Sequence, residues 1–335
     1  MNMLTPRIAV ITPCYNEEQV LGETRRRLSE LLDRLAAAGK ISPESRMYFV
    51  DDGSRDATWL LIDRLAAEDP RIVGIKLSRN VGHQNALLAG LLTAEGDALV
   101  SIDADLQDDV EVIEEMVDAF RTGTQVVYGV RRRRETDTAF KRMTAHGFYR
   151  LMQGMGVSVL NDHADFRLMG RAAVEALRQF REVNLFLRGM VPLLGFPASV
   201  VYYDRAERFA GTSKYPLRRM LALALDGITS FSVVPLRLIT ATGLLVFAIS
   251  SLLGLWVLGA ALFTDSVVPG WASTVLPIYL LGGIQILFLG VLGEYAGKIY
   301  KEVKHRPRFI IERTTSQAAR PVFVNTDVRF FMPPE

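Results

Sequence analysis

Cysteine is nearly absent from the chain, since Cys14 is the only one among 335 residues. A lone cysteine cannot form an intrachain disulfide, so the composition gives no sign of an oxidising compartment. Cys14 lies in an apolar, strand-forming stretch, where we interpret it as a small buried hydrophobic residue. Residues 1–7 also lack a positively charged start followed by an apolar core, so we expect no signal peptide.

An excess of one charge is lacking too, because the formal net charge is only +2 at pH 7. So small a net charge does not indicate nucleic acid as a partner. The charge is distributed unevenly, however. The first two thirds of the chain are rich in charged residues, whereas residues 236–292 carry almost none. The chain therefore divides into a charged, soluble part and an apolar part.

The apolar part contains two uncharged stretches, 238–264 and 267–292. Each exceeds the ~20 residues with which a helix crosses a bilayer, so we predict two transmembrane helices rather than a buried hairpin of a large soluble domain. The loop 265–275 has no basic residue, whereas five follow the second stretch: Lys298, Lys301, Lys304, Arg306 and Arg308. By the positive-inside rule, both ends of the chain are expected in the cytoplasm.

Strand-like and helix-like stretches alternate through residues 7–130. The predicted strands are 7–12, 46–50, 72–77, 98–102 and 126–130, and the predicted helices are 20–38, 57–68, 80–93 and 110–121. This order predicts a mostly parallel α/β sheet with helices on both faces. Ligands of such sheets bind at the carboxyl ends of the strands.

Less regular stretches follow. We predict helices at 139–155 and 182–194, a strand at 197–203, and an amphipathic, interfacial helix or helix pair at 215–234. Residues 161–169 combine two acids and an arginine before a helix. The tail, 309–335, contains strand-like runs at 309–311 and 322–324, and we consider docking on a neighbouring subunit for it.

Two carboxylates follow the strand that begins at Ala98. Asp103 and Asp105 are two residues apart, and in extended backbone this spacing places both on one side of the chain. Hard oxygen ligands suit Mg²⁺ or Mn²⁺ that also carries phosphate oxygens. The alternative is an acidic surface turn. Polar loops at 13–17 and 51–56 end neighbouring strands at the same edge, and this convergence favours a ligand site.

Three other charged features near this edge have competing interpretations. The run Arg131–Arg134 is either a solvated charge run or, beside a diphosphate, a set of anion ligands. We interpret Asp108 and Asp109 as carboxylates that favour a helix start. We interpret His83, near another helix start, as structural or solvent-facing rather than catalytic.

Several stretches in this order and spacing resemble one family. They are PCYNE, VDDGSRDAT, LSRNVGHQNALLAG, SIDADLQDD, ADFRLM, RFAGTSKYPLRRM and GEYAGKIYKEV, and they cover Ile8 to about Arg308. They resemble the family-2 glycosyltransferases of the polyprenyl-phosphate type. The bactoprenol glucosyltransferases are similar over the whole chain, and the dolichol-phosphate mannose synthases through the first domain.

The resemblance implies a domain plan. Residues 1–214 would form a cytoplasmic, Rossmann-like GT-A catalytic domain with a mostly parallel sheet, and residues 215–235 amphipathic interfacial helices. Residues 236–297 would form a hairpin of two transmembrane helices, at about 238–264 and 272–294, before a basic cytoplasmic tail at 298–335. We expect a multi-pass protein of the inner (plasma) membrane, and two thin spans under a large cytosolic domain favour a homo-oligomer.

The resemblance also assigns site residues. The metal ligands would be Asp103, Asp105 and Gln107, for Mg²⁺ or Mn²⁺. The nucleotide-sugar contacts would be Pro13, Tyr15, Glu17, Asp52, Asp103 and Ala104. The catalytic set would be Arg131, Asp165, Arg208 and Lys214, and the acceptor-phosphate contacts Arg167, Arg208 and Lys214. Asp165 is left with two roles, as a general base or as a group that orients the acceptor. An acceptor phosphate is already largely dianionic at neutral pH, so it needs less help from a base.

The implied activity is inverting, metal-dependent transfer of a sugar to polyprenyl phosphate at the lipid bilayer, with UDP-glucose as the leading donor. The lipid-linked sugar would serve cell-envelope glycan modification. Alternatives are another sugar (mannose, an amino-arabinose derivative or GlcNAc) and a catalytically silent, nucleotide-sugar-binding scaffold. A processive polysaccharide synthase would need more spans and a Q-x-x-R-W motif, which this sequence lacks.

Overall fold

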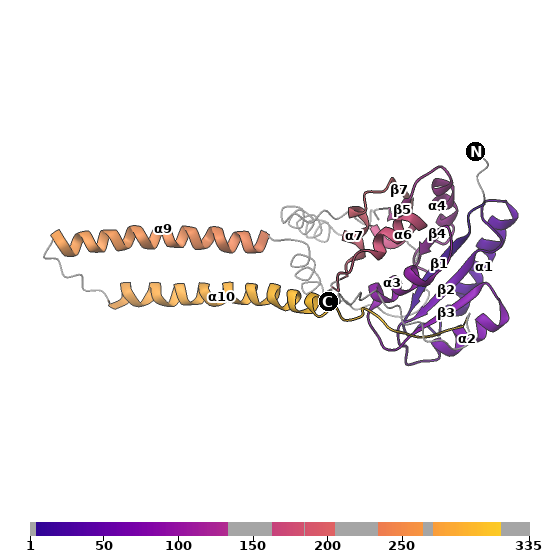
Figure 1. Ribbon diagram of the computed structural model, residues 1–335, viewed down its shortest axis with the longest axis horizontal. Helices are drawn as coiled ribbons and strands as arrows, with labels where there is room; N and C mark the ends of the chain where they lie inside the picture. The colour runs from indigo at the N-terminus through magenta and orange to yellow at the C-terminus, as the bar shows by residue number, and fades with distance from the viewer. Residues whose placement is uncertain (1–4, 133–162, 184, 205–233, 264–270, 316–335) are drawn as a thin grey trace, which may run out of the picture. The chain divides into compact units, whose positions relative to one another are not determined.

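A computed structural model describes residues 5–132, 163–183, 185–204, 234–263 and 271–315 (Figure 1). The chain divides into two compact units. One, the sheet unit, comprises residues 1–138, 160–214 and 306–335. The other, the helix-pair unit, comprises residues 139–159 and 215–305. The apolar part inferred from charge, residues 236–292, falls within the helix-pair unit.

The sheet unit is built on an eight-stranded sheet of order β7-β5-β6-β4-β1-β2-β3-β8. Its strands are β1 (Ile8–Cys14), β2 (Arg46–Asp51), β3 (Ile72–Leu77), β4 (Ala98–Ser101), β5 (Val126–Arg131), β6 (His163–Gly170), β7 (Ala198–Tyr203) and β8 (Ile311–Thr314). All neighbours pair in parallel except where β6 or β8 takes part. The predicted mostly parallel sheet is confirmed.

Helices cover both faces of the sheet. They are α1 (Leu21–Ala37), α2 (Thr58–Glu68), α3 (His83–Thr93), α4 (Val112–Arg121), α6 (Arg171–Arg178) and α7 (Leu187–Leu193). The leucines of the α1 apolar stripe are buried with Val10, Phe49 and Val100 in one core. On the other face α3 approaches β1 so closely that a Cβ at Gly90 would lie 2.4 Å from Ile11 Cγ2, which only glycine avoids.

β6 is the element that the sequence did not predict. Residues 161–169 were expected as a charged segment before a helix, yet His163–Gly170 forms an antiparallel strand between β4 and β5. A strand buried on both faces shows no alternation of polar and apolar residues, and Asp165 and Arg167 gave it the look of a loop. The helix predicted at 139–155 lies outside the described residues.

β8 closes the far edge of the sheet by pairing antiparallel with β3. The Gly74 N–H donates to Thr315 Oγ1 at 2.8 Å, and the Arg313 guanidinium lies 4.9 Å from the Trp59 ring centroid. The first strand-like run of the tail therefore leads into a strand on this chain's own sheet, so this part of the tail does not need a neighbouring subunit to dock on. The second run, 322–324, lies outside the described residues.

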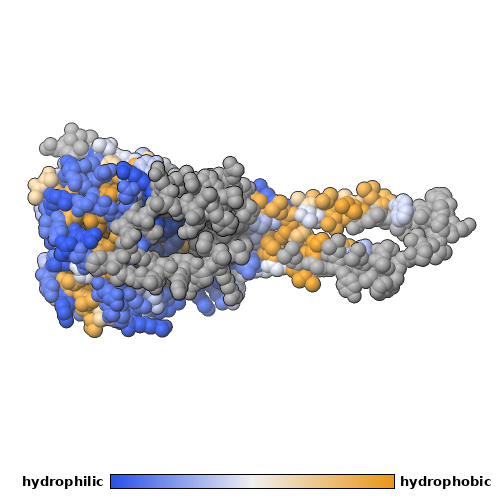
Figure 2. Space-filling view, turned by 180° about the vertical axis from the view of Figure 1, so that it is seen from behind, coloured by the Kyte–Doolittle hydropathy of each residue, from blue (hydrophilic) through white to orange (hydrophobic). Residues whose placement is uncertain are grey.

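The helix-pair unit contains α9 (Val234–Phe263) and α10 (Trp271–Val303), which contact each other. Apolar side chains gather along the pair (Figure 2), and Leu245, Leu252 and Ile286 are among the exposed ones. Both helices lie where the apolar stretches are, but they extend into charged sequence, α9 at Arg237 and α10 at its carboxyl end.

The spanning role predicted for these helices is a separate matter. In the part of the chain that the structure describes, no helix combines the length and the apolar character that a membrane crossing requires. The predicted transmembrane hairpin is therefore not found, although the two helices are. Residues 215–233, predicted as interfacial helices, lie outside the described residues.

Candidate active site

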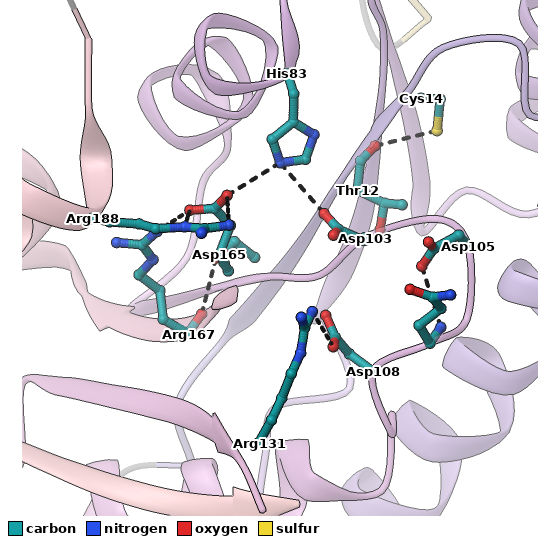
Figure 3. A network of polar contacts seen from close by, with 12 residues as sticks. Thr12, Cys14, His83, Asp103, Asp105, Asp108, Arg131, Asp165, Arg167 and Arg188 are labelled. Atoms are coloured by element: carbon teal, nitrogen blue, oxygen red, sulfur yellow. Dashed lines mark hydrogen bonds and ion pairs between the residues drawn. The ribbon is translucent and has the colours of Figure 1, made fainter. Parts of the chain in front are cut away.

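Polar side chains converge where β1, β2 and β4 end and where the antiparallel β6 begins (Figure 3). The register pairs Ser101 of β4 with Arg167 of β6, so Asp165 lies beyond the carboxyl end of β4. The first turn of α3 adds His83 to the same edge. The convergence that the sequence predicted for parallel strands is thus extended by one antiparallel strand.

The residues that follow β4, 103–108, form what we call the acidic loop. β4 ends at Ser101, and Ala104 and Asp105 lie in a turn, so the extended backbone assumed for the two carboxylates is wrong. Asp105 Oδ1 accepts a hydrogen bond from the Gln107 N–H at 3.2 Å. Leu106 has a φ of 56°, a left-handed conformation that is strained for a leucine. A tight turn, not a pleat, presents these side chains.

Asp103 faces His83 across the site. His83 Nε2 lies 3.4 Å from Asp103 Oδ1 and 3.6 Å from Asp165 Oδ2. Burial, reinforced by the negative charges of Asp108, Asp165 and Asp105, raises the pKa of Asp103 to about 6 against the opposing effect of His83. Burial alone would lower the pKa of His83, but Asp165 and Asp103 outweigh it and raise the pKa. His83 is 43% exposed and ion-paired with two carboxylates, which agrees with its interpretation as structural or solvent-facing and adds a position at the centre of the site.

Asp165, Arg167 and Arg188 form what we call the arginine cluster. Arg167 Nη2 donates to Asp165 Oδ1 at 2.6 Å. Arg188 donates twice, from Nε to Oδ1 at 3.2 Å and from Nη2 to Oδ2 at 3.0 Å. Burial alone would raise the pKa of Asp165, but the bond from His83 and the charges of both arginines hold it well below its usual range.

Arg167 is enclosed within the sheet unit. Its residue is 1% exposed, and its two terminal nitrogens donate to Asp165 and, at 3.3 Å, to the Leu187 carbonyl. Ser101 Oγ donates to the backbone carbonyls of Asp165 and Arg167, which fastens β6 to β4. A side chain so enclosed has no surface for a lipid phosphate, so the predicted acceptor contact of Arg167 is corrected to an internal, supporting position.

Arg131 belongs to a second network, on the other side of the acidic loop. Arg131 Nη2 lies 3.2 Å from Asp108 Oδ1, its Nε donates to the Tyr203 hydroxyl at 3.2 Å, and that hydroxyl donates to Asp108 Oδ1. Asp108 is buried, so its interpretation as a helix-start carboxylate is wrong. Asp109 does lie at the turn before α4, where its Oδ1 accepts from the Glu111 N–H at 3.0 Å.

Asp52 holds the start of α3. Its two carboxylate oxygens accept the Val81 and Gly82 N–H groups at 2.7 and 3.0 Å. Gly53 beside it has a φ of 66°, and a Cβ there would lie 2.6 Å from the Asn80 nitrogen, so this turn requires glycine. The nucleotide contact assigned to Asp52 stays a prediction.

The other predicted nucleotide contacts border the same edge. Pro13 and Ala104 are buried, Glu17 is half-buried, and the Tyr15 side chain is exposed. Thr24 Oγ1 donates to the Ala104 carbonyl at 2.9 Å and so ties α1 to the acidic loop. Arg208 and Lys214, predicted as catalytic and acceptor-binding cations, lie outside the described residues.

The acidic loop suits a divalent cation. Asp103 holds its charge among other carboxylates, and Asp108 Oδ2 is buried without a hydrogen-bond partner, so a cation would relieve both. Among the described residues, no three His, Cys, Asp or Glu side chains are grouped to hold a metal. Mg²⁺ commonly takes one or two carboxylates and completes its shell with water and substrate phosphates. The donor set fits that mode of binding.

Sequence reasoning missed Arg188 and Tyr203, and it did not predict the contacts of His83 with Asp103 and Asp165. Arg188 lies in a segment predicted only as apolar and helical, and Tyr203 in a strand read for its apolar pattern. His83 gave one signal, its place in the loop after β3 at the edge where ligands bind. All three gain their role from contacts with residues 20 or more positions away, which no local pattern displays.

Comparisons with known proteins agree with this arrangement. The model of the family "Glycosyl transferase family 2" matches residues 9–178. The uncharacterized glycosyltransferase YkoT of Bacillus subtilis is 48% identical, covering 93% of each chain. The bactoprenol glucosyl transferase of Shigella phage SfII is 41% identical over 92% of this chain and 98% of its own.

Solved structures are more distant. The mannosyltransferase PcManGT from Pyrobaculum calidifontis, in complex with GDP-Man and Mn²⁺, is 17% identical with a TM-score of 0.44, covering 87% of each chain. Likeness at that level carries no argument about this site. The family match and the near full-length relatives show that the chain belongs to glycosyl transferase family 2. It is a glycosyltransferase with the expected Rossmann-like GT-A fold.

Proposed function

We propose that this enzyme transfers glucose from UDP-glucose to a polyprenyl phosphate and thereby makes a lipid-phosphate-sugar for cell-envelope glycan modification. The observation that carries the proposal is the near full-length similarity, at 41%, to a protein named bactoprenol glucosyl transferase. The geometry supports it, because an acidic loop and an arginine cluster face each other across His83 at one edge of the sheet.

The donor would bind on the side of the acidic loop. In the transfer, an oxygen of the acceptor phosphate attacks the anomeric carbon, the bond from that carbon to the diphosphate breaks, and the nucleoside diphosphate leaves with the electron pair. Asp103, Asp105 and Gln107 would hold Mg²⁺ or Mn²⁺, which when bound stabilises the charge on the leaving diphosphate. Arg131, held by Asp108 and Tyr203 with its side chain 30% exposed, offers a second positive charge.

The acceptor would bind on the side of the arginine cluster. A phosphate monoester is largely dianionic at neutral pH, so it attacks without first losing a proton. Its polyprenyl tail remains in lipid, so the site has to work at a membrane surface. The exposed apolar side chains of α9 and α10 and the basic residues around Lys301 support such a location, and we place it at the cytoplasmic face of the plasma membrane.

Incubation of the purified full chain with polyprenyl phosphate and labelled donors tests the proposal. We expect a lipid-linked hexose from UDP-glucose, identified by mass spectrometry of the extracted lipid, and no product when polyprenol lacking the phosphate replaces the acceptor. GDP-mannose, UDP-GlcNAc and a UDP-linked amino-arabinose derivative serve as competing donors. Product from one of these alone would overturn the choice of glucose, and no lipid product from any donor would overturn the acceptor.

A further inference from the structure

Arg188 lies at the start of α7, at a point where the backbone is held from two sides. The Leu187 N–H donates to Gln84 Oε1 at 3.0 Å, and the Leu187 carbonyl accepts from Arg167 Nη1 at 3.3 Å. Gln84 belongs to α3 and Arg167 to β6. Two separate elements therefore fix the residue that precedes Arg188, so its side chain leaves the backbone from a defined place.

The guanidinium of Arg188 is held as firmly as its backbone. Asp165 accepts from its Nε at 3.2 Å and from its Nη2 at 3.0 Å (Figure 3). Contact at two atoms sets the plane of a guanidinium as well as its position. Asp165 is 6% exposed in this arrangement, whereas the Arg188 side chain is 40% exposed. Asp165 is thus the enclosed anchor, and Arg188 is the member of the cluster with open surface.

The arginine cluster carries more positive than negative charge. Asp165 supplies one negative charge, and Arg167 and Arg188 supply two positive ones. Arg167 is enclosed, so the unbalanced charge is available to a ligand only at Arg188. A planar guanidinium with outward N–H groups matches the oxygens of a phosphate. The cluster is therefore suited to bind a phosphate monoester at its exposed arginine.

The same contacts argue against Asp165 as a general base. A base must accept a proton on an oxygen that reaches the substrate. Both Asp165 oxygens already accept hydrogen bonds from arginines, and the carboxylate is enclosed. Ion pairing with two arginines stabilises the charged form and makes the carboxylate a poor proton acceptor. The contacts leave Asp165 the role of a support.

We propose that Arg188 binds the phosphate of the acceptor, and that Asp165 is a positioning residue for Arg188 and not the base of the reaction. Arg167 and Gln84 are positioning residues of the same kind, acting through Leu187. The inference rests on the proposed function, since it takes a phosphate monoester as the acceptor. It resolves the choice between the two roles that the sequence left to Asp165.

The test compares four variants of the full chain: Arg188→Gln, Arg188→Lys, Asp165→Asn and the double variant Asp165→Asn/Arg188→Gln. Arg64→Gln, which removes an exposed arginine of α2, is the matched control. Binding of farnesyl phosphate is measured by calorimetry in the presence of UDP and Mn²⁺. Turnover with polyprenyl phosphate gives kcat and KM separately. Circular dichroism verifies that each variant is folded, and Arg188→Gln, at a partly exposed position, decides the question if Asp165→Asn unfolds.

We expect Arg188→Gln and Asp165→Asn each to weaken farnesyl phosphate binding at least about tenfold, which corresponds to a hydrogen-bonded charge. The affinity of the double variant for farnesyl phosphate should stay within about threefold of that of the weaker-binding single variant, because both changes remove the same contact between Arg188 and the phosphate. The affinity of Arg188→Lys should lie between those of the wild type and Arg188→Gln, since lysine keeps the positive charge but lacks the two-pronged guanidinium. At saturating acceptor, kcat should stay within about threefold of the wild type.

Two results would overturn the inference. One is unchanged farnesyl phosphate binding in Arg188→Gln. The other is an Asp165→Asn variant that binds normally but loses kcat by about 10² or more, which is the mark of a missing base. The proposed function fails differently, when the wild type makes no lipid product. If the wild type then still binds farnesyl phosphate through Arg188, the inference stands; if it binds none, the inference fails as well.

Discussion

Asp103 and Asp165 lie on either side of His83, and the other charges around them differ in sign. Asp103 lies in the acidic loop, among other carboxylates, with a pKa raised to about 6. Asp165 lies in the arginine cluster, with a pKa held well below its usual range. Two aspartates at one sheet edge therefore differ in their charge partners. Asp103 lies among other carboxylates, whereas Asp165 is paired with two arginines.

The strongest test of this contrast is to neutralise Asp103. We expect Asp103→Asn to lower kcat/KM by about 10³-fold, because the charge that would hold a divalent cation at the diphosphate is lost. Measurement of sugar transfer over a range of Mn²⁺ concentrations checks this. Chelation should lower wild-type activity by a similar factor and have little further effect on the variant. Full activity of Asp103→Asn in the presence of chelator would show that the reaction does not need a divalent cation at Asp103.

Removal of Asp165 should act mainly on stability. Asp165→Ala leaves Arg167 buried and without its carboxylate, so the free energy of unfolding should fall by about 3 kcal/mol. Denaturant unfolding measured by circular dichroism checks the size. Asp105→Ala, at a half-buried position in the acidic loop, is the matched control and should change stability by less than about 1 kcal/mol. Equal losses of unfolding free energy in Asp165→Ala and Asp105→Ala would contradict the conclusion that Asp165 supports the fold more than a carboxylate of the acidic loop does.

The unfolding free energies of the wild type and Asp165→Ala should depend differently on pH in the acid range. The folded pKa of Asp165 is lower than its unfolded value, so its contribution is present above about pH 4 and is lost as the pH falls through the folded value. The difference in unfolding free energy between wild type and Asp165→Ala should grow slightly from pH 7 to 5, because Asp165 raises the pKa values of His83 and Asp103, and it should shrink below about pH 4. A difference that shrinks already between pH 7 and 5 would show that Asp165 is not so held.

The smallest expected effect has the opposite sign. Asp103 carries its charge against other carboxylates, so Asp103→Asn should raise the free energy of unfolding at pH 7 in the presence of chelator. Its side chain is 36% exposed, so solvent screening limits the gain to roughly 1 kcal/mol. Excess Mn²⁺ should abolish the difference or reverse it. A loss of stability without metal would mean that Asp103 is supported like Asp165.

The two sides of the site also differ in how far the sequence predicted them. On the side of β1 to β4, regular alternation of strands and helices predicted the sheet, the edge and the loops that end there. The side of β6 was not predicted, because an antiparallel strand enclosed on both faces has no period to detect. Asp165 was singled out through family resemblance, yet its support by Arg188 depends on a contact between separate elements.

Residue roles were harder to predict than residue places. Arg167 was expected at the acceptor because it matches a family motif, but burial decides whether such an arginine contacts a ligand or supports a neighbouring residue. Asp108 shows the same limit, since a carboxylate before a helix normally serves that helix. Here β5 and β7 bring Arg131 and Tyr203 to it instead.

The backbone at Leu106 has a consequence for ligand binding. A left-handed leucine costs of order 1 kcal/mol or more, and burial of its side chain helps to retain it. This strain lowers the free energy of unfolding, but it does not lower the affinity for a ligand, because the turn is already formed. Asp105 and Gln107, on either side of Leu106, are then already arranged, so the cation and nucleotide of the proposed function would lose little of their affinity to ordering the loop.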